Sequence, residues 1–443
     1  MNQTRVRVVH LANRHDDEPS AGHGYWLNHA LKDSCEAGGI EFVIAASRHN
    51  KDSSVEKILT LSKQKRIQFT AWPYLGLSKD VQNLEQILAA APGVESFLHI
   101  YEGGLREYLI IILLRNRNPS LRIIFNFNLA DPWNISLISR GFSSKLIWRI
   151  ISDCASRLAG GVLFTAETLE LAQLFSTRSN FPMIEYPLPA QFSEPRVSYE
   201  SKIYDFFIPV FGPEELELVC SALNDLKEKG RGKLKVIIQP KWSSSIPENT
   251  LDMLSRLGVE IAAPIISQNE YKTKLVKSRG LILPYKNLDY YKLQSSGRMV
   301  DAVANGTRVI VPEGTSLARK VQGNGWGSTF DVCSGTSLAK AMGEILEIEE
   351  PFTSHGPLLT PFYSIVGLLE QITPADSLGE TMSASRMRFS RTRVLVMGLL
   401  FLTTDFRSFI SGVLSFIGVS TGMQASLSRI FPRRTSPVRG PCK

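Results

Sequence analysis

The chain has 443 residues, of which 43% are hydrophobic and 21% are charged, and these proportions exclude a disordered, collagen-like or coiled-coil protein. At about 150 residues per domain, the length predicts two or three domains, each able to bury its own core. The formal net charge of +8 does not indicate nucleic-acid binding, because residues 381–443 carry ten basic side chains and one acidic side chain. That segment has a net charge of +9, so the first 380 residues sum to −1 and the basic character belongs to the C-terminal tail.

Apolar, β-branched runs alternate with longer amphipathic stretches through the first part of the chain. The runs that we expect to form strands lie at 6–12, 40–46, 97–101, 121–127 and 161–164. The stretches with helical periodicity lie at 25–36, 55–64, 105–116 and 143–158. Continuous apolar strands separated by amphipathic helices predict a parallel sheet with helices on both faces.

The segment 184–202 contains three prolines and no clear periodicity, which predicts a linker, and a second series of strands and helices follows it. The strands of this series are expected at 204–210, 234–239, 259–262, 280–284 and 307–311, and its helices at 214–229, 249–257, 269–277 and 295–304. The fold class is therefore α/β, with two doubly wound domains in tandem over 1–190 and 203–350, and a C-terminal helix and tail over 351–443. Ligands of such sheets bind beyond the carboxyl ends of strands, so function is expected in the loops that follow strands.

The most informative of these loops lies within GLILPYKNLDYYKLQSSGRMVDAVANGTRVIVPEGT, residues 280–315. A tyrosine-rich loop follows the strand, and the turn Ser295-Ser296-Gly297 opens a helix that Asn305-Gly306 should end. A helix N-terminus of this composition offers unpaired N–H groups and a favourable dipole to an anion, most naturally a phosphate. The alternative is that one of the serines only caps the helix. Cations near the turn favour the phosphate site: Lys286, Lys292 and Arg298.

The stretch SSGRMVDAVANGTRVIVPEGTSLA resembles the donor-binding segment of GT-B glycosyltransferases, particularly those of the family 4 type. Its residues Asp301-Ala302-Val303-Ala304-Asn305-Gly306 match that family's signature of an acid, Ala, three variable residues and Gly. The resemblance covers roughly residues 202–347 and, more loosely, the first domain. It implies two Rossmann-like domains that face a cleft, with a nucleotide-diphosphate sugar as substrate and neither a metal nor another cofactor.

The resemblance also implies roles for the residues of this segment. Ser295, Ser296 and Gly297 would contact the diphosphate, and Asp301 would bind the ribose, because a carboxylate can accept hydrogen bonds from both hydroxyls of a vicinal diol. The alternative for Asp301 is a solvated helix residue. The family usually has Glu at this position and a second Glu eight residues earlier, where this chain has Leu293. The missing acid is consistent with altered sugar handling or with lost activity.

Two further residues that follow strands complete the donor side. Lys241 lies where GT-B enzymes often place a cation that would stabilise the departing diphosphate, although lysines after strands are often only solvated. Gly212 would allow the backbone to approach a ligand closely, or it is a plain turn glycine. The expected donor-binding residues are Gly212, Lys241, Tyr285, Ser295, Ser296, Gly297, Arg298 and Asp301.

The first domain offers a candidate acceptor side. The segment SAGHGYWLNHAL, residues 20–31, resembles the acceptor loop of the same fold, where His23 would act as a general base or bind a sugar hydroxyl. The alternative is a structural histidine. Polar residues after two other strands, including Asn126, suit carbohydrate binding. The catalytic candidates are His23 and Lys241, and the expected acceptor-binding residues are Tyr25, Glu102, Asn128 and Asp131.

Other sequence features exclude competing classes and address location. The chain lacks the motifs of a P-loop NTPase, a GxSxG esterase and a GxGxxG dehydrogenase, and the acidic loop at 15–18 has no partner cluster for a metal. Five scattered cysteines indicate neither a disulfide framework nor a zinc cluster, and the charged N-terminus is not typical of a secretory signal, so we expect a cytoplasmic protein. Apolar runs at 394–402 and 409–419 are too short to span a bilayer; with their arginines they predict either peripheral contact with the inner face of the membrane or packing against the domains.

Together these features predict a metal-independent glycosyltransferase of polysaccharide biosynthesis that moves a sugar from a nucleotide-diphosphate donor to a saccharide or lipid-linked acceptor. The second domain would hold the donor and the first the acceptor, and no nucleic-acid partner is expected. The family 4 resemblance implies retention of the anomeric configuration; an inverting reaction would need a base, for which His23 is the candidate. Two alternatives remain open: a nucleotide-sugar epimerase of the same fold, and an inactive GT-B-like binding or assembly subunit.

Overall fold

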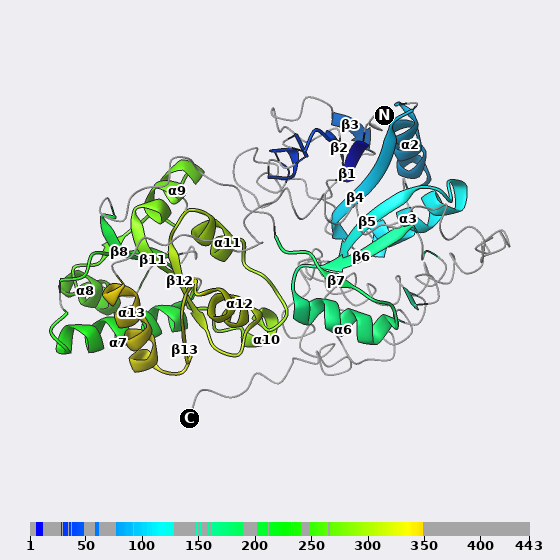
Figure 1. The fold of residues 1–443 in the computed structure, drawn as a ribbon. Coiled ribbons are helices and arrows are strands. Elements are labelled where there is room, and N and C mark those ends of the chain that lie inside the picture. The colour runs from blue at the N-terminus through cyan, green and yellow to red at the C-terminus, as the bar shows by residue number, and fades with distance from the viewer. Residues whose placement is uncertain are drawn as a thin grey trace, which may run out of the picture.

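The computed structural model describes two lobes, each built on a parallel sheet (Figure 1). The described residues are 6–11, 28–47, 58–61, 77–127, 161–188 and 202–348, with gaps at 29, 34, 37, 92, 104, 211, 232, 241–245, 247 and 265, together with the single residues 148, 151, 152 and 158. We call the part up to residue 188 the N-lobe and the part from residue 202 the C-lobe.

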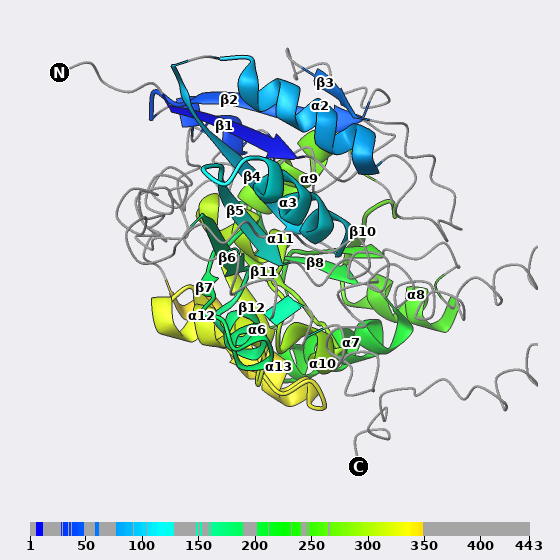
Figure 2. The ribbon, with the colours of Figure 1, turned by 90° about the vertical axis from the view of Figure 1, so that its right-hand side faces the viewer.

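The N-lobe sheet has seven strands in the order β3-β2-β1-β4-β5-β6-β7, and all of its strand pairs are parallel. The strands are β1 (Val6–Leu11), β2 (Glu41–Ser47), β3 (Ile58–Leu61), β4 (Glu95–Gly103), β5 (Arg122–Phe127), β6 (Val162–Ala166) and β7 (Ile184–Glu185). The helices with described bounds are α2 (Leu77–Ala89), α3 (Leu105–Arg117) and α6 (Leu169–Ser179). Helices α2 and α3 lie side by side on one face of this sheet (Figures 1 and 2).

The C-lobe sheet has six strands in the order β10-β9-β8-β11-β12-β13, again all parallel. The strands are β8 (Tyr204–Val210), β9 (Val236–Pro240), β10 (Glu260–Ile261), β11 (Ser278–Ile282), β12 (Arg308–Pro312) and β13 (Gly327–Phe330). The helices are α7 (Pro213–Glu228), α8 (Glu248–Arg256), α9 (Gln268–Val276), α10 (Leu288–Tyr291), α11 (Gly297–Ala304), α12 (Ser316–Asn324) and α13 (Gly335–Glu347).

Both sheets follow the doubly wound strand order 3-2-1-4-5-6, and this confirms the expected fold class. The order reverses between β1 and β4 in the N-lobe and between β8 and β11 in the C-lobe. At such a switch point the loops after the two strands run in opposite directions, and a crevice that can take a ligand forms between them. The two switch points therefore locate the places where a site is expected.

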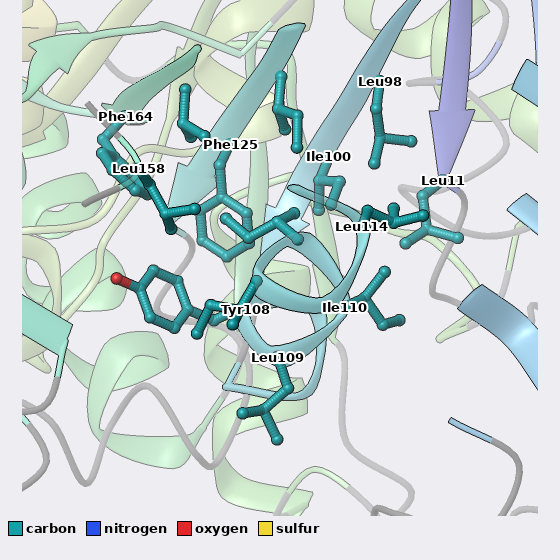
Figure 3. Packing of buried hydrophobic residues seen from close by; sticks show 14 of the residues in the cluster. Leu11, Leu98, Ile100, Tyr108, Leu109, Ile110, Leu114, Phe125, Leu158 and Phe164 are labelled. Carbon is teal, nitrogen blue, oxygen red and sulfur yellow. The ribbon is translucent and has the colours of Figure 1, made fainter. Parts of the chain in front are cut away.

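The N-lobe core forms where the sheet packs against its helices. Leu98, Ile100 and Phe125 project from the strands towards α3, and Leu114 lies on the facing side of that helix (Figure 3). Leu109 points to the other side of α3 and is nevertheless buried. A helix that is buried on both sides needs apolar residues all round, which explains the uninterrupted run LIIILL in α3.

The C-lobe sheet has an apolar core on each face. Phe206 and Ile208 of β8 pack with α7 and α13, whereas Phe207 points to the opposite face, which α11 and α12 cover. This alternation follows from the two-residue period of a strand. Burial on both faces requires the continuous apolar strands from which the sequence analysis predicted a parallel sheet.

Two sequence-based assignments are wrong. The segment 55–64 was expected to be helical, but Ile58–Leu61 forms β3, which pairs with β2 at the sheet edge. A four-residue apolar run fits either structure, and the open edge of β2 decides between them. The expected linker at 184–202 begins with β7, which pairs with β6, and Tyr186 is buried. Helices α2, α6, α10, α12 and α13 and strand β13 were not predicted.

The structure also bears on the cysteines and on membrane helices. Cys35 and Cys220 are free and buried, whereas Cys333 is disulfide-bonded, which the scattered spacing did not predict. Among the described residues, no helix combines the length and the apolar character that crossing a membrane requires. The tail at 351–443, with its two apolar runs, lies outside the described residues, so its contact with a membrane stays a prediction.

Candidate functional site

The switch point of the C-lobe brings the start of α7 close to the loop after β11. Gly212 caps α7 without a side-chain hydrogen bond, and Pro213 occupies the first helical position. A Cβ atom at Gly212 would meet no atom within 4 Å, so the space in front of this backbone is open. Lys286 Nζ, in the loop after β11, lies 3.9 Å from Glu214 Oε2 in the first turn of α7 and links the two sides.

The N-terminus of α11 lies on the β11 side of this switch point. Ser296 is the N-cap, and its Oγ accepts a hydrogen bond from the Met299 amide at 3.4 Å. The Tyr285 hydroxyl lies 3.1 Å from the same oxygen, and the Tyr285 ring stacks on Tyr291 with centroids 3.9 Å apart. The Ser296 hydroxyl therefore caps α11, as the capping alternative predicted.

Ser295 differs from its neighbour. It is only 5% exposed, and its Oγ has no hydrogen-bond partner among the described residues. A buried hydroxyl without a partner costs about 1–3 kcal/mol and calls for an explanation. The first amides of a helix have no acceptor within it. An anion at this turn would supply an acceptor both to those amides and to the Ser295 hydroxyl.

Asp301 lies in the middle of α11 in a strongly charged setting. Burial raises the pKa of its carboxyl to about 6, while the charges of Lys272 on α9 and Arg298 lower it. The Tyr271 hydroxyl is buried, and its pKa is raised well above the ordinary value by burial and then by the Asp301 charge. Asp301 is only partly exposed, so it is not the fully solvated helix residue of the alternative interpretation. A carboxyl with a pKa near neutrality beside two cations is typical of functional sites.

The structure brings most of the expected donor-binding residues together. Those that gather at the start of α11 are Tyr285, Ser295, Ser296, Gly297, Arg298 and Asp301, and Gly212 lies across the switch point. Lys241 lies outside the described residues. The cation Lys292 is paired with Asp289, at 3.2 Å, and so contributes less positive charge than the sequence suggests.

The expected acceptor side is described only in part. His23, Tyr25, Asn128 and Asp131 lie outside the described residues, and only the backbone of Glu102 is described, within β4. Asn126 is fully buried: its amide donates to the Tyr101 carbonyl and accepts from the Thr165 hydroxyl, both at 2.8 Å. Asn126 therefore serves the interior of the N-lobe, and its expected contribution to an acceptor site is wrong.

A buried histidine pair at the N-lobe switch point was missed by the sequence analysis. His10 of β1 and His99 of β4 are register partners, and their Nδ1 atoms lie 3.0 Å apart. Burial lowers the pKa of His10 to about 4 and that of His99 well below its ordinary value. His99 Nε2 has no partner among the described residues. The available signal was a histidine within each of two largely apolar runs, at 6–12 and 97–101.

The contact between the lobes was also missed, and we call it the seam. Thr168 Oγ1 donates to the Leu293 carbonyl at 2.5 Å, and Gln294 Nε2 donates to Glu167 Oε2 at 2.8 Å. Salt bridges lie beside these bonds: Arg319 contacts Glu170 at 2.6 Å, and Lys320 contacts Glu185 at 2.9 Å. The seam consists of Glu167, Thr168, Glu170 and Glu185 of the N-lobe and Leu293, Gln294, Arg319 and Lys320 of the C-lobe.

No protein-family model and no curated protein matches the chain. The structure is similar to that of a glycosyltransferase from Rickettsia africae ESF-5, with a TM-score of 0.54 and 10% identity over 88% of this chain and 100% of that one. It is also similar to a candidate UDP-N-acetylglucosamine 2-epimerase from Listeria monocytogenes, with a TM-score of 0.51 and 11% identity over 86% and 98% of the two chains. The chain has the GT-B fold. Within this fold, the residues around α11 occupy the switch point of the C-lobe.

The described residues of this region form no cluster of hard ligands for a cation. Among the described residues, no group of three or more His, Cys, Asp and Glu side chains is placed to hold one metal ion. Asp301 instead has Lys272 and Arg298 as its charged neighbours.

Proposed function

We propose that this protein is a glycosyltransferase that binds a nucleotide-diphosphate sugar in the C-lobe and transfers the sugar to a saccharide or lipid-linked acceptor on the N-lobe. The observation that carries the proposal is the N-terminus of α11. There a buried Ser295 hydroxyl, without a partner among the described residues, lies beside the first amides of the helix that carries the partly buried Asp301 carboxyl. The GT-B fold places this turn at a switch point.

The diphosphate would sit on the turn at 295–298. The Ser295 hydroxyl and the first amides of α11 would donate to its oxygens, and the helix dipole with the Arg298 charge would favour the anion. These groups stabilise the diphosphate most when it leaves and gains negative charge, which lowers the barrier to transfer. Lys241 would add a cation to the leaving group, and no metal is required in this scheme.

Asp301 would hold the ribose of the donor. Its carboxylate can accept a hydrogen bond from each hydroxyl of a vicinal diol, provided that the group is ionised. The charges of Lys272 and Arg298 favour the ionised form against the effect of burial. Donor binding and ionisation of Asp301 are thus linked.

The reaction breaks the bond between the sugar's anomeric carbon and the diphosphate and forms a bond from that carbon to an acceptor hydroxyl oxygen. With retention of configuration, the departing diphosphate takes the acceptor's proton. With inversion, a base on the N-lobe takes it, and His23 is the candidate. The resemblance to the family 4 type favours retention.

A second candidate function has its own support. The Listeria protein, named as a candidate UDP-N-acetylglucosamine 2-epimerase, shares the fold at a TM-score of 0.51. An epimerase would use the same donor site and no separate acceptor. The third alternative, an inactive binding subunit, rests on Leu293 standing where the resemblance implies an acid.

Calorimetric titration with UDP and with UDP- and GDP-sugars tests the proposal. We expect saturable binding that Ser295→Ala weakens by about tenfold, since one hydrogen bond to a charged group is lost. Ser334→Ala is the matched control, because Ser334 caps α13 and lies outside the site. The absence of saturable binding by the wild-type protein would contradict the proposal. Product analysis separates a glycosylated acceptor from a donor whose sugar has only been epimerised, and binding without turnover identifies the inactive subunit.

A further inference from the structure

The turn that precedes α11 is held by both lobes. The Leu293 carbonyl accepts the Thr168 hydroxyl at 2.5 Å, and the Leu293 side chain packs against the apolar core of the N-lobe. Leu293 belongs to the C-lobe in sequence, yet it completes the packing of the other lobe. Its backbone is therefore fixed by a hydrogen bond and a hydrophobic contact across the seam.

Gln294 is fixed from both sides as well. Its side-chain amide donates to Glu167 at 2.8 Å across the seam, and its carbonyl accepts the Ser316 hydroxyl at 2.7 Å within the C-lobe. Both members of the cross-seam bond are buried, Glu167 being 1% and Gln294 6% exposed. Hydrogen bonds in such surroundings are strong and hold one geometry.

We propose that Glu167 and Thr168 are positioning residues: by gripping Leu293 and Gln294, they set the shape of the diphosphate-binding turn and so couple docking of the lobes to donor affinity. This inference rests on the proposed function of that turn. Ser295 follows Gln294 directly, so the fixed backbone at 293–294 determines where the Ser295 hydroxyl and the first amides of α11 lie. Without the hydrogen bonds to Leu293 and Gln294, the ligand would have to order the turn when it binds, and this would lower its affinity.

The polar character of the contacts made by Glu167 and Thr168 supports a role beyond joining the two lobes. A buried carboxyl group paired with an amide is costly to desolvate, and apolar residues would join two lobes at lower cost. The polar bonds do what apolar contacts cannot, because they fix the position of individual backbone and side-chain atoms. Coupling of this kind is reciprocal, so a bound diphosphate stabilises docking as much as docking favours the diphosphate.

The test compares two glutamates of the same seam. Glu167→Ala removes the acceptor for Gln294, whereas the matched control Glu170→Ala removes a salt bridge to Arg319 that does not involve the turn. We expect Glu167→Ala to weaken UDP binding by about tenfold or more. Glu170→Ala should change it by less than about threefold, since the pair is partly exposed. Glu167→Gln retains a carbonyl oxygen as acceptor and should restore most of the affinity.

Hydrogen exchange in the peptide that spans 292–298 provides a readout that needs no ligand. We expect faster exchange there in Glu167→Ala and wild-type exchange in Glu170→Ala. Gln294→Met, which keeps the side-chain length but loses the donor, gives the same test should Glu167→Ala fold poorly. Wild-type UDP affinity, or wild-type exchange at 292–298, in both Glu167→Ala and Gln294→Met would overturn the inference. If the wild-type protein binds no nucleotide, the proposed function fails, and the exchange data still decide whether Glu167 orders the turn.

Discussion

The ionised carboxylate of Asp301 lowers the stability of the folded protein. Burial raises the pKa of its carboxyl from an ordinary value of 3.8 to about 6, so the folded protein binds this proton more tightly than the unfolded chain. The ionised carboxylate consequently destabilises the fold above about pH 6, and the penalty disappears as the pH falls towards 4. A group retained at such a cost is a candidate for function.

We therefore expect Asp301→Asn to raise stability at pH 8 by about 1–2 kcal/mol, because a partly buried charge is removed, and to have little effect near pH 4. Urea unfolding at the two pH values measures this difference. The same variant should bind UDP more weakly, since the amide has one accepting oxygen instead of two and forms weaker hydrogen bonds than a carboxylate. The control is Asp225→Asn, whose carboxylate forms an i,i+4 pair with Lys229 on α7. Lower stability of Asp301→Asn at pH 8, or unchanged UDP affinity, would contradict this account.

Adjacent serines have different roles at the same turn. From the sequence, Ser295 and Ser296 are equivalent candidates for a phosphate contact. The structure assigns the Ser296 hydroxyl to the Met299 amide and to Tyr285, and leaves that of Ser295 without a partner among the described residues. Which hydroxyl the helix uses depends on the backbone angles at the cap, and residue type alone does not reveal them.

At the scale of elements, position 327, the first residue of β13, requires glycine. Its φ is +157°, and an added Cβ would overlap the carbonyl of Val309 on β12. We expect Gly327→Ala to lower the free energy of unfolding by about 2–4 kcal/mol, since β12 and β13 would have to separate. Gly323→Ala in α12 is the control, because a Cβ there meets open space and alanine favours a helix. Equal stabilities in thermal unfolding would show that the strands adjust freely.

The C-lobe elements up to β12 that were predicted lie close to their observed bounds, whereas α10, α12, α13 and β13 were missed. Strand β8 has the predicted bounds, and the predicted helix at 295–304 begins two residues before α11 and ends at the same residue. These segments have a clear apolar period and recognisable ends. The short run at 58–61 and the pair at 184–185 form strands only because a neighbouring edge accepts them, and that information lies elsewhere in the chain.

The candidate site likewise combines features that the local sequence predicts with contacts between residues far apart in the sequence. The turn at 295–297 and Asp301 lie in one short stretch at the start of α11 and could be predicted from local sequence. The contacts that hold that turn could not, because Thr168 and Leu293 are 125 residues apart, and Glu167 and Gln294 are 127 apart. Side chains that meet only after two domains dock leave no local pattern. Leu293 is noticeable in the sequence only as a missing acid.

Across the whole molecule, the two lobes have separate cores, and a buried lysine helps to join them. Lys320 is 3% exposed, and its Nζ lies 2.9 Å from Glu185 and 3.3 Å from the Glu167 carbonyl. We expect Lys320→Met to weaken docking by about 1–3 kcal/mol, because Glu185 would lose its buried partner. In scanning calorimetry the lobes should then unfold in two transitions further apart than in the wild type, whereas the exposed Lys340→Met should not change the trace. Identical traces for both variants would show that other contacts dominate docking.

The seam has a practical consequence for recombining halves of GT-B proteins. Its members on one side come from the connection between β6 and α6, from α6 and from β7, and those on the other side from the turn before α11 and from α12. A chimera that exchanges the C-lobe would need to inherit compatible residues at all of these places, although none of them contacts the sugar in our scheme. In a hybrid with mismatched seam residues, both lobes would fold, but the turn before α11 would not adopt the geometry that binds the donor. Exchanging a lobe to change donor preference therefore also requires matching the seam residues of the two lobes.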